Sequence, residues 1–271
     1  MTKISILGCG WLGLPLAKAL LGKGFSVNGS TTSVEKLSVL ENSGINPFLI
    51  ALSEVKTDGN IVGFLENSEI LIVDVPPKLR GSGTENFVSK IRNVIPFIEK
   101  SSINKLIFIS STSVYGDTHA VVSEETTPHP DTESGKQLLE TEQLLQSNKN
   151  FKTTMLRFGG LIGLDRHPVK FLAGRENLDN PEAPINLIHQ EDCIGIILKI
   201  IEDNSWNETF NAVTPSHPSR ERYYTQKAIR LNLALPKFNH SAPSIGKIIL
   251  SDKVETILNY TFTKPNLYSE N

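Results

Sequence analysis

The sequence contains little cysteine, with only two such residues among 271. Cys9 and Cys193 allow one disulfide at most, and a single bridge is not the framework of a small secreted protein. Cysteine and histidine also lack the short, regular spacings of metal sites. We therefore expect a hydrophobic core to stabilise the fold, and we expect no metal centre.

The chain also lacks an excess of charge of either sign. Its 27 lysine and arginine residues against 29 aspartate and glutamate residues give a formal net charge of −2. Such a balance provides no long-range attraction to nucleic acid or to an anionic membrane surface. No run approaches the ~20 apolar residues that a membrane-spanning helix needs. We therefore expect neither nucleic acid nor a membrane as a partner.

The opening residues, MTKISILGCGWLGLPLAKAL, carry almost no charge and imitate an export signal. However, no small-residue cleavage site with a following linker is evident, and the downstream sequence continues as the rest of a nucleotide-binding unit. We therefore expect this segment to belong to the fold and the protein to be cytoplasmic.

Short apolar runs alternate with helical patterns over the first part of the chain. The predicted strands are 3–8, 25–30, 45–52, 69–77, 103–111 and 151–160, and the predicted helices are 11–24, 33–44, 85–102 and 134–148. Pro96 is expected to bend or end the third of these helices. Apolar strands alternating with helices are typical of a parallel sheet that is buried on both faces. We therefore predict the α/β class, with a Rossmann-type doubly wound parallel sheet.

The pattern changes after Gly163, because prolines and glycines cluster in the residues that follow. Two further strands, at 185–190 and 208–213, flank a helix at 191–203. The predicted organisation is a dinucleotide-binding core of 1–162 to which 185–215 returns, and a small C-terminal, substrate-side lobe of 163–184 and 216–271.

The opening run contains GCGWLG, a G-x-G-x-x-G spacing that directly follows a predicted strand and opens a helix. In this context Gly8 permits a tight turn, Gly10 lets a diphosphate approach the backbone, and Gly13 lets the helix pack closely on the strand. Trp11 and Leu12 belong to the same turn, where a helix N-terminus offers free N–H groups. We therefore predict that this turn binds a dinucleotide.

The second strand should end near the adenosine ribose, where an NAD-binding protein usually has an acidic residue. This chain has Ser30, Thr31 and Thr32 there, with Lys36 nearby. Hydroxyl groups and a lysine suit a 2′-phosphate, so we predict NADP as the cofactor, with NAD as the alternative. The same residues could also cap the next helix, and the two roles are compatible.

Val75 and Pro76 stand close to the end of the predicted fourth strand, 69–77. Because the carboxyl ends of parallel strands line the ligand crevice, we predict that these two residues contact the cofactor. Loop geometry alone is the alternative explanation for the proline.

Three later segments carry a resemblance to a known family. They are SSTSVYGD at 110–117, LRFGGLIGLDRHP at 156–168 and INLIHQEDC at 185–193. In these segments the chain resembles the extended short-chain dehydrogenases/reductases, the sugar-nucleotide epimerases and dehydratases. The resemblance covers roughly the whole chain. It implies a Rossmann core, bound NAD or NADP, a small-molecule substrate in a pocket between core and lobe, and a homodimer as one assembly.

The chain departs from that family at the catalytic pair, which is a tyrosine four residues before a lysine on one helix. The resemblance implies that Lys136 is this lysine and also holds the nicotinamide ribose, but Thr132 stands where the tyrosine would be. A threonine hydroxyl titrates too high to act as an acid or base near neutral pH. Ser111 matches the family's residue that hydrogen-bonds the substrate oxygen. The resemblance therefore implies an atypical branch without the tyrosine.

Another residue could supply the proton, with Tyr115, His129, Glu133 and His189 as the candidates, or the reaction could need no tyrosine at all. We assign catalytic roles to Ser111, Lys136 and Tyr115, and substrate contacts to Ser111, Arg166 and His189. Structural roles are the alternatives: Tyr115 could cover a strand end, Lys136 could be solvated, and His189 could be a structural histidine. Arg166 could be an ordinary surface arginine.

Two functions remain open from the sequence. The first is an oxidoreductase or epimerase-like enzyme that uses NADP or NAD on a small polar, sugar-derived substrate. The second is a non-catalytic module that binds the dinucleotide as a signal.

Overall fold

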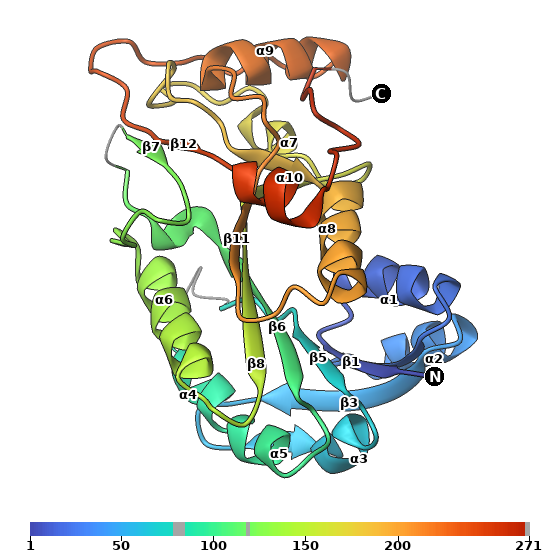
Figure 1. Ribbon diagram of the computed structural model, residues 1–271. Coiled ribbons are helices and arrows are strands. Elements are labelled where there is room, and N and C mark those ends of the chain that lie inside the picture. The colour runs from blue at the N-terminus through green and yellow to red at the C-terminus, as the bar shows by residue number, and fades with distance from the viewer. Residues whose placement is uncertain (78–84, 118–119, 269–271) are drawn as a thin grey trace.

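Figure 1 shows the computed structural model of the chain, which describes residues 1–77, 85–117 and 120–268. Its main element is a sheet with the strand order β11-β8-β6-β5-β1-β2-β3-β4. β4 is antiparallel to β3, and the other neighbouring strands are parallel. The strands are β1 Lys3–Leu7, β2 Ser26–Thr31, β3 Asn46–Leu52, β4 Thr57–Gly59, β5 Ile70–Val73, β6 Lys105–Ser111, β8 Lys152–Phe158 and β11 Thr209–Ala212.

The central strands are apolar because both faces of the sheet are covered. In β5, Ile70 and Ile72 pack into one core, whereas Leu71 and Val73 pack into the other. The first core is closed by α1 Gly13–Gly22, α2 Glu35–Asn42, α8 Gln190–Glu202 and α10 Asp252–Leu258. The second is closed by α3 Ile61–Leu65, α4 Phe87–Arg92, α5 Ile95–Glu99 and α6 Glu133–Gln146. This arrangement confirms the predicted doubly wound α/β fold.

The order in which the chain adds strands to the sheet reverses at β1. From β1 the chain proceeds outward through β2 and β3, and then returns to β5 on the other side and continues through β6, β8 and β11. Ligand crevices in such sheets form at this switch point, outside the carboxyl ends of the strands. The residues that follow β1 and β5 therefore lie where a ligand is expected.

One predicted helix differs in the structure. The segment 85–102 forms two short helices, because α4 ends at Arg92 and α5 begins at Ile95. Pro96 lies in the first turn of α5, where its missing N–H costs nothing. The same missing N–H prevents one continuous helix.

The sequence predicts that 185–215 returns to the sheet, and in the structure β11 forms the edge of that sheet while α8 packs against it. β10 Leu187–His189 instead pairs with β9 Gly160–Ile162 in a separate two-stranded sheet. The Gly159–Gly160 pair permits this close pairing, since a Cβ on Gly159 would lie 2.6 Å from the carbonyl oxygen of Asn186. The missing side chains let the β10 segment approach β9 directly.

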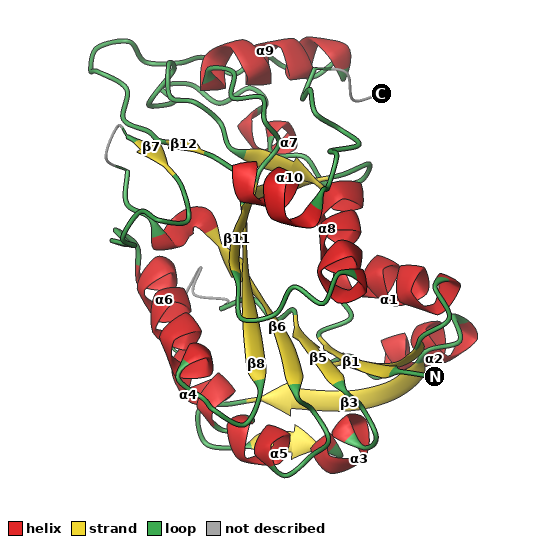
Figure 2. Cartoon of the chain, in the orientation of Figure 1, coloured by secondary structure: helices red, strands yellow, loops and turns green. Residues whose placement is uncertain are grey.

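Beyond β9 the chain builds a lobe with its own small core, shown at the top of Figures 1 and 2. The helices α7 Val169–Leu172 and α9 Arg220–Arg230 pack together there. A short parallel pair, β7 Val121–Val122 and β12 Ile248–Ile249, ties the C-terminal segment back to the loop after β6. α10 does not belong to this lobe, because Val254 and Leu258 pack into the core of the main sheet.

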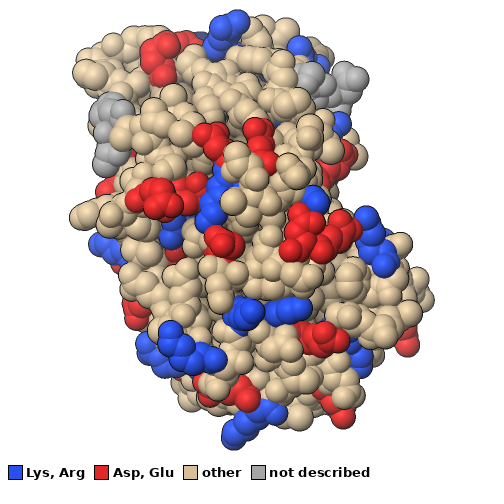
Figure 3. Space-filling model, viewed as in Figure 1, with Lys and Arg blue, Asp and Glu red and all other residues tan. Residues whose placement is uncertain are grey.

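The surface agrees with the balanced composition. On the face shown in Figure 3, basic and acidic side chains are interspersed. None of the helices among the described residues has the length and apolar character needed to cross a bilayer.

Candidate functional site

The described residues form two cavities at the carboxyl ends of the central strands. The larger has a volume of about 1060 Å³ and is lined by residues after β5, β6 and β8, by α6 and by the lobe. The smaller, of about 170 Å³, is lined by the glycine turn, the end of β2, residues after β5 and α4. Pro76 lines both. The two cavities therefore meet at the switch point of the sheet.

The glycines of the turn differ in the space that surrounds each one. Gly8 has φ +109°, and a Cβ there would lie 2.3 Å from the carbonyl oxygen of Asp74. A Cβ on Gly13 would lie 2.2 Å from the carbonyl oxygen of Gly8. A Cβ on Gly10 would meet no atom within 4 Å, although Gly10 lines the smaller cavity. Gly8 and Gly13 are thus required by packing, whereas Gly10 leaves the backbone open to a ligand.

The end of β2 supports this turn and faces the smaller cavity. Ser30 is buried, and its Oγ accepts a hydrogen bond of 2.9 Å from the Gly8 amide. Thr31 Oγ1 accepts one of 3.1 Å from the Ser33 amide. Ser30, Thr31 and Thr32 line the smaller cavity, whereas Lys36 is exposed and lies outside both linings.

Asp74 and Lys90 belong to the smaller cavity and were missed by the sequence analysis. Asp74 directly follows β5, a position that could have pointed to it. Burial raises its pKa to about 8, although the Gly13 amide and the charge of Arg166 oppose the shift. Lys90 Nζ contacts the Glu85 carboxylate. The turn therefore has a carboxyl group that ionises near neutral pH.

Cys9 lies in the turn, but it is not a reactive thiol. It is buried, and burial together with the nearby Asp74 raises its pKa to about 12. Cys193 is also free and buried. The interpretation of Cys9 as a small buried residue fits this environment.

Trp11 connects the glycine turn to the loop that follows β9. Its indole N–H donates a 2.8 Å hydrogen bond to Asp165 Oδ1, and Gln190 Nε2 donates one of 2.7 Å to its carbonyl oxygen. The Arg166 guanidinium lies over its ring, 5.0 Å from the centroid. The turn and the lobe therefore meet at Trp11.

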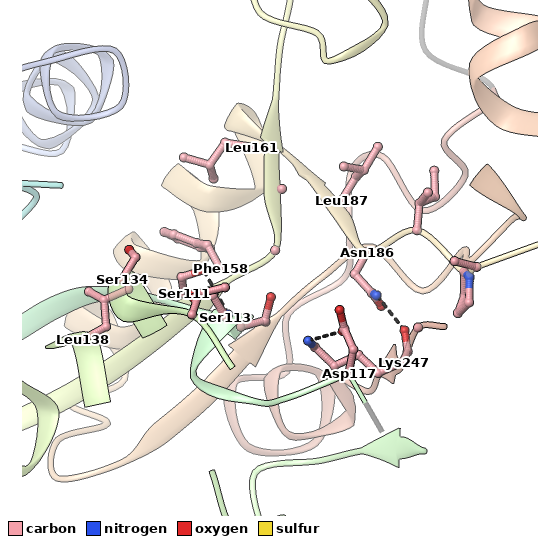
Figure 4. A pocket seen from close by; sticks show the side chains of 18 of the residues that line it. Ser111, Ser113, Asp117, Ser134, Leu138, Phe158, Leu161, Asn186, Leu187 and Lys247 are labelled. Carbon is pink, nitrogen blue, oxygen red and sulfur yellow. Dashed lines mark hydrogen bonds and ion pairs between the residues drawn. The ribbon is translucent and has the colours of Figure 1, made fainter. Parts of the chain in front are cut away.

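A row of hydroxyl-bearing residues lines one wall of the larger cavity, and Figure 4 shows two of them, Ser111 and Ser113. It consists of Ser110 and Ser111 at the end of β6, followed by Thr112 and Ser113 in the 3-10 helix Thr112–Val114. Ser111 Oγ accepts a 3.1 Å hydrogen bond from the Ser113 amide. Ser111 thus lines the cavity, where its predicted contact with a substrate oxygen requires it.

The structure does not place Lys136 in the cavity. α6 presents Ser134 and Leu138 to the larger cavity, and Figure 4 shows both on its wall. Lys136 is exposed and lines neither cavity. A two-residue step turns a helix by about 200°, so Lys136 points away from the side that Leu138 occupies. Thr132 lines the cavity, and its Oγ1 caps α6 by accepting a 3.1 Å hydrogen bond from the Gly135 amide.

Tyr115 is buried in a polar network instead of facing a cavity. Arg157 Nη1 donates a 2.6 Å hydrogen bond to its hydroxyl, which donates one of 3.0 Å to Asn211 Oδ1. Arg157 also pairs with Glu142, with 2.5 Å between Nη2 and Oε2. Burial raises the pKa of Tyr115, and the Arg157 charge opposes it. These contacts favour the structural alternative for Tyr115 and do not support the catalytic role.

His189 is also buried outside the two linings. It precedes α8, and its Nδ1 accepts a 3.3 Å hydrogen bond from the Glu191 amide. Its placement therefore fits a helix cap and not the predicted substrate contact.

Among the described residues, the basic side chains that line the larger cavity are Arg166, Arg220 and Lys247. Lys247 Nζ donates hydrogen bonds of 2.7 Å to Asp117 Oδ1 and 2.9 Å to the Tyr115 carbonyl. Figure 4 shows this contact beside Asn186, whose amide donates to the Lys247 carbonyl. Lys247 reaches the site only because β12 pairs with β7, so no local pattern in the sequence could have revealed it.

Comparison with known proteins identifies a relative along the whole chain. The chain is 34% identical over 268 residues to Protein YeeZ of Escherichia coli (strain K12), and the match covers 98% of this chain and 97% of that protein. The chain belongs to the YeeZ family. No family model matches this YeeZ-family sequence.

Solved structures share the fold of this YeeZ-family chain at lower identity. UDP-glucuronic acid 4-epimerase from Bacillus cereus in complex with NAD has a TM-score of 0.80 at 20% identity, covering 99% of this chain and 95% of that one. UDP-N-acetylglucosamine 4-epimerase from Bacillus cereus has a TM-score of 0.74 at 14% identity, covering 97% and 94%. The predicted resemblance to the epimerase and dehydratase family is thus confirmed for the fold.

Proposed function

We propose that the chain is a dinucleotide-binding enzyme of the epimerase and dehydratase type, with NADP preferred to NAD. The observation that carries this proposal is Gly10, whose missing side chain leaves the turn backbone open beside a cavity that continues past Pro76. The amides of Trp11 and Leu12 would hold the diphosphate, because a helix N-terminus favours negative charge, whereas the Gly10 amide donates a 2.8 Å hydrogen bond to the Gly8 carbonyl. Val75 and Pro76 would border the cofactor along the crevice.

The preference for NADP rests on the end of β2. Thr31 and Thr32 present hydroxyl groups to the smaller cavity, and no carboxylate follows them at the strand end. Lys90 adds a positive charge to the same cavity. A 2′-phosphate would therefore meet hydrogen-bond donors and no acidic side chain from β2. The UDP-glucuronic acid 4-epimerase from Bacillus cereus, in contrast, was solved with NAD.

The larger cavity supports a small polar substrate, and we propose a sugar derivative with an anionic group. The hydroxyl groups of Ser111 and Ser113 can hydrogen-bond its reacting end, while Arg220 and Lys247 supply positive charge at the lobe. The named activities of the structural neighbours, 4-epimerases of UDP-sugars, agree with this substrate class. When bound, the nicotinamide would exchange a hydride with the substrate carbon.

The proton chemistry of this site would be atypical. Ser134 and Leu138 lie four positions apart on α6, as the family's tyrosine and lysine do, and both line the cavity. Neither side chain exchanges a proton near neutral pH. Of the four proton donors that the sequence suggested, Glu133 is the one among the cavity-lining residues. We therefore assign the proton transfer to Glu133, and structural or surface positions to Tyr115 and Lys136.

The test is a titration of the purified protein with NADPH, NADH and NAD⁺ by calorimetry. We expect Gly10→Ala to weaken binding about tenfold or more, because its Cβ would occupy the approach of the diphosphate. Gly22→Ala is the matched control, since a Cβ there also meets no atom within 4 Å but lies at the far end of α1. Absence of dinucleotide binding to the wild type would refute the proposal, and binding without turnover of any sugar nucleotide would favour the non-catalytic module.

A further inference from the structure

We propose that Arg166 is a cofactor residue, whose guanidinium neutralises the diphosphate of the dinucleotide at the glycine turn. This assignment rests on the dinucleotide binding proposed above. It differs from the substrate contact that the sequence suggested, and it gives the lobe a direct part in holding the cofactor.

The first support is the way in which the loop 163–166 is fixed to the turn. Asp165 accepts the indole N–H of Trp11 at 2.8 Å, and the Arg166 guanidinium stacks over the same ring. A Cβ on Gly163 would lie 2.8 Å from Trp11 Cζ2, so glycine is needed for this close approach. Because Trp11 is itself a residue of the turn, these contacts hold Arg166 beside the backbone that would receive the diphosphate.

The second support is charge. Among the described residues, Arg166 has no ion-pair partner, whereas Lys90 pairs with Glu85 and Lys247 pairs with Asp117. The neighbouring Asp165 carboxylate already accepts from Trp11. Arg166 therefore keeps its hydrogen-bond donors available, in a cavity that continues past Pro76 to the turn.

The third support is that the positive charge of Arg166 acts electrostatically on a group beside the glycine turn. Arg166 is a source of the electrostatic effect that opposes the raised pKa of Asp74, and the Asp74 carbonyl lies against Gly8. A diphosphate carries two negative charges, and the helix N-terminus offers only about half a positive charge. A stacked arginine supplies one further full positive charge, and its planar fork fits phosphate oxygens better than a lysine would.

The experiment measures the affinities of Arg166→Ala and Arg166→Lys for NADPH and for ADP-ribose, which contains the diphosphate without the nicotinamide. We expect the alanine variant to lose about tenfold or more for both probes, and the lysine variant to lose less. Arg175→Ala removes one exposed charge from the same lobe outside both cavities, and its affinities should match the wild type.

Fluorescence gives an independent check of the stack. In a Trp206→Phe background Trp11 is the remaining tryptophan, and adding Arg166→Ala should shift its emission. Wild-type affinity of Arg166→Ala for both probes would overturn the assignment while leaving the proposed function intact. Failure of the wild type itself to bind any dinucleotide would instead refute the proposed function.

Discussion

The two ends of the crevice are built by different means. The glycine turn is defined by backbone geometry, since Gly8 and Gly13 stand where any side chain would collide with main-chain atoms. The wall of α6 and β6 is defined by side chains, with Ser134 and Leu138 on the cavity and a buried Arg157–Glu142 pair behind them. A backbone that leaves no room for side chains requires glycine at fixed positions, and this spacing can be recognised in the sequence. The side chains that a helix turns toward a cavity depend on how the helix packs.

The largest expected effect is on the buried ion pair. Arg157→Met would leave the Glu142 carboxylate buried with Ser110 as its remaining donor, and we expect a loss of about 3–5 kcal/mol of unfolding free energy. The double variant Arg157→Met, Glu142→Leu should recover much of that loss, because it removes both charges. Urea unfolding followed by circular dichroism measures both.

The control for this prediction is the partly exposed pair Lys199–Asp203 at the C-terminal end of α8. Lys199→Met should cost less than about 1 kcal/mol. If the double variant is no more stable than Arg157→Met, the stability of the α6 wall does not depend on a coupled charge pair. The proposed difference between this wall and the glycine turn would then be wrong.

A smaller effect concerns Asp74. Its folded pKa of about 8 lies above the ordinary value of about 3.9, so between these values the folded protein retains a proton that the unfolded chain releases. The contribution of protonated Asp74 to the free energy of unfolding is fully present below about pH 4 and is lost as the pH rises through 8. Asp74→Asn should remove this decline, which is at most about 1.4 kcal/mol per pH unit.

Unfolding free energies of the wild type and Asp74→Asn at pH 6, 7 and 9 test this prediction. Dinucleotide affinity should fall over the same range in the wild type, because an ionised carboxylate would then lie close to the diphosphate. Parallel pH profiles of the two proteins would show that Asp74 does not titrate there, and that the turn is built from backbone alone.

The smallest effect is expected for Lys136. Because its side chain is exposed and lies outside both cavities, Lys136→Ala should change dinucleotide affinity less than about twofold and stability by less than about 0.5 kcal/mol. Lys90→Ala is the informative comparison, since Lys90 lines the smaller cavity and its removal should weaken binding. A tenfold loss in Lys136→Ala would mean that α6 presents a different face to the ligand.

The sequence supported the sheet, the glycine turn and most of the helices, because apolar periodicity and glycine spacing are local signals. It failed where a contact is distant in the chain. Lys247 reaches the cavity through the β7–β12 pairing, and Trp11 meets Asp165 across 154 positions. The predicted roles of Tyr115 and His189 depended on exposure, and both side chains are buried.

The sequence alone determined the parallel strands of the sheet, the helices α1, α2, α6 and α8 that cover it, and the glycine turn, because glycine spacing and buried strands obey local steric rules. Tertiary structure alone decided which side chains face the cavities. A shift of two residues on α6 exchanges Lys136 for Ser134 or Leu138, and only the packing of the helix against β6 and β8 selects between them.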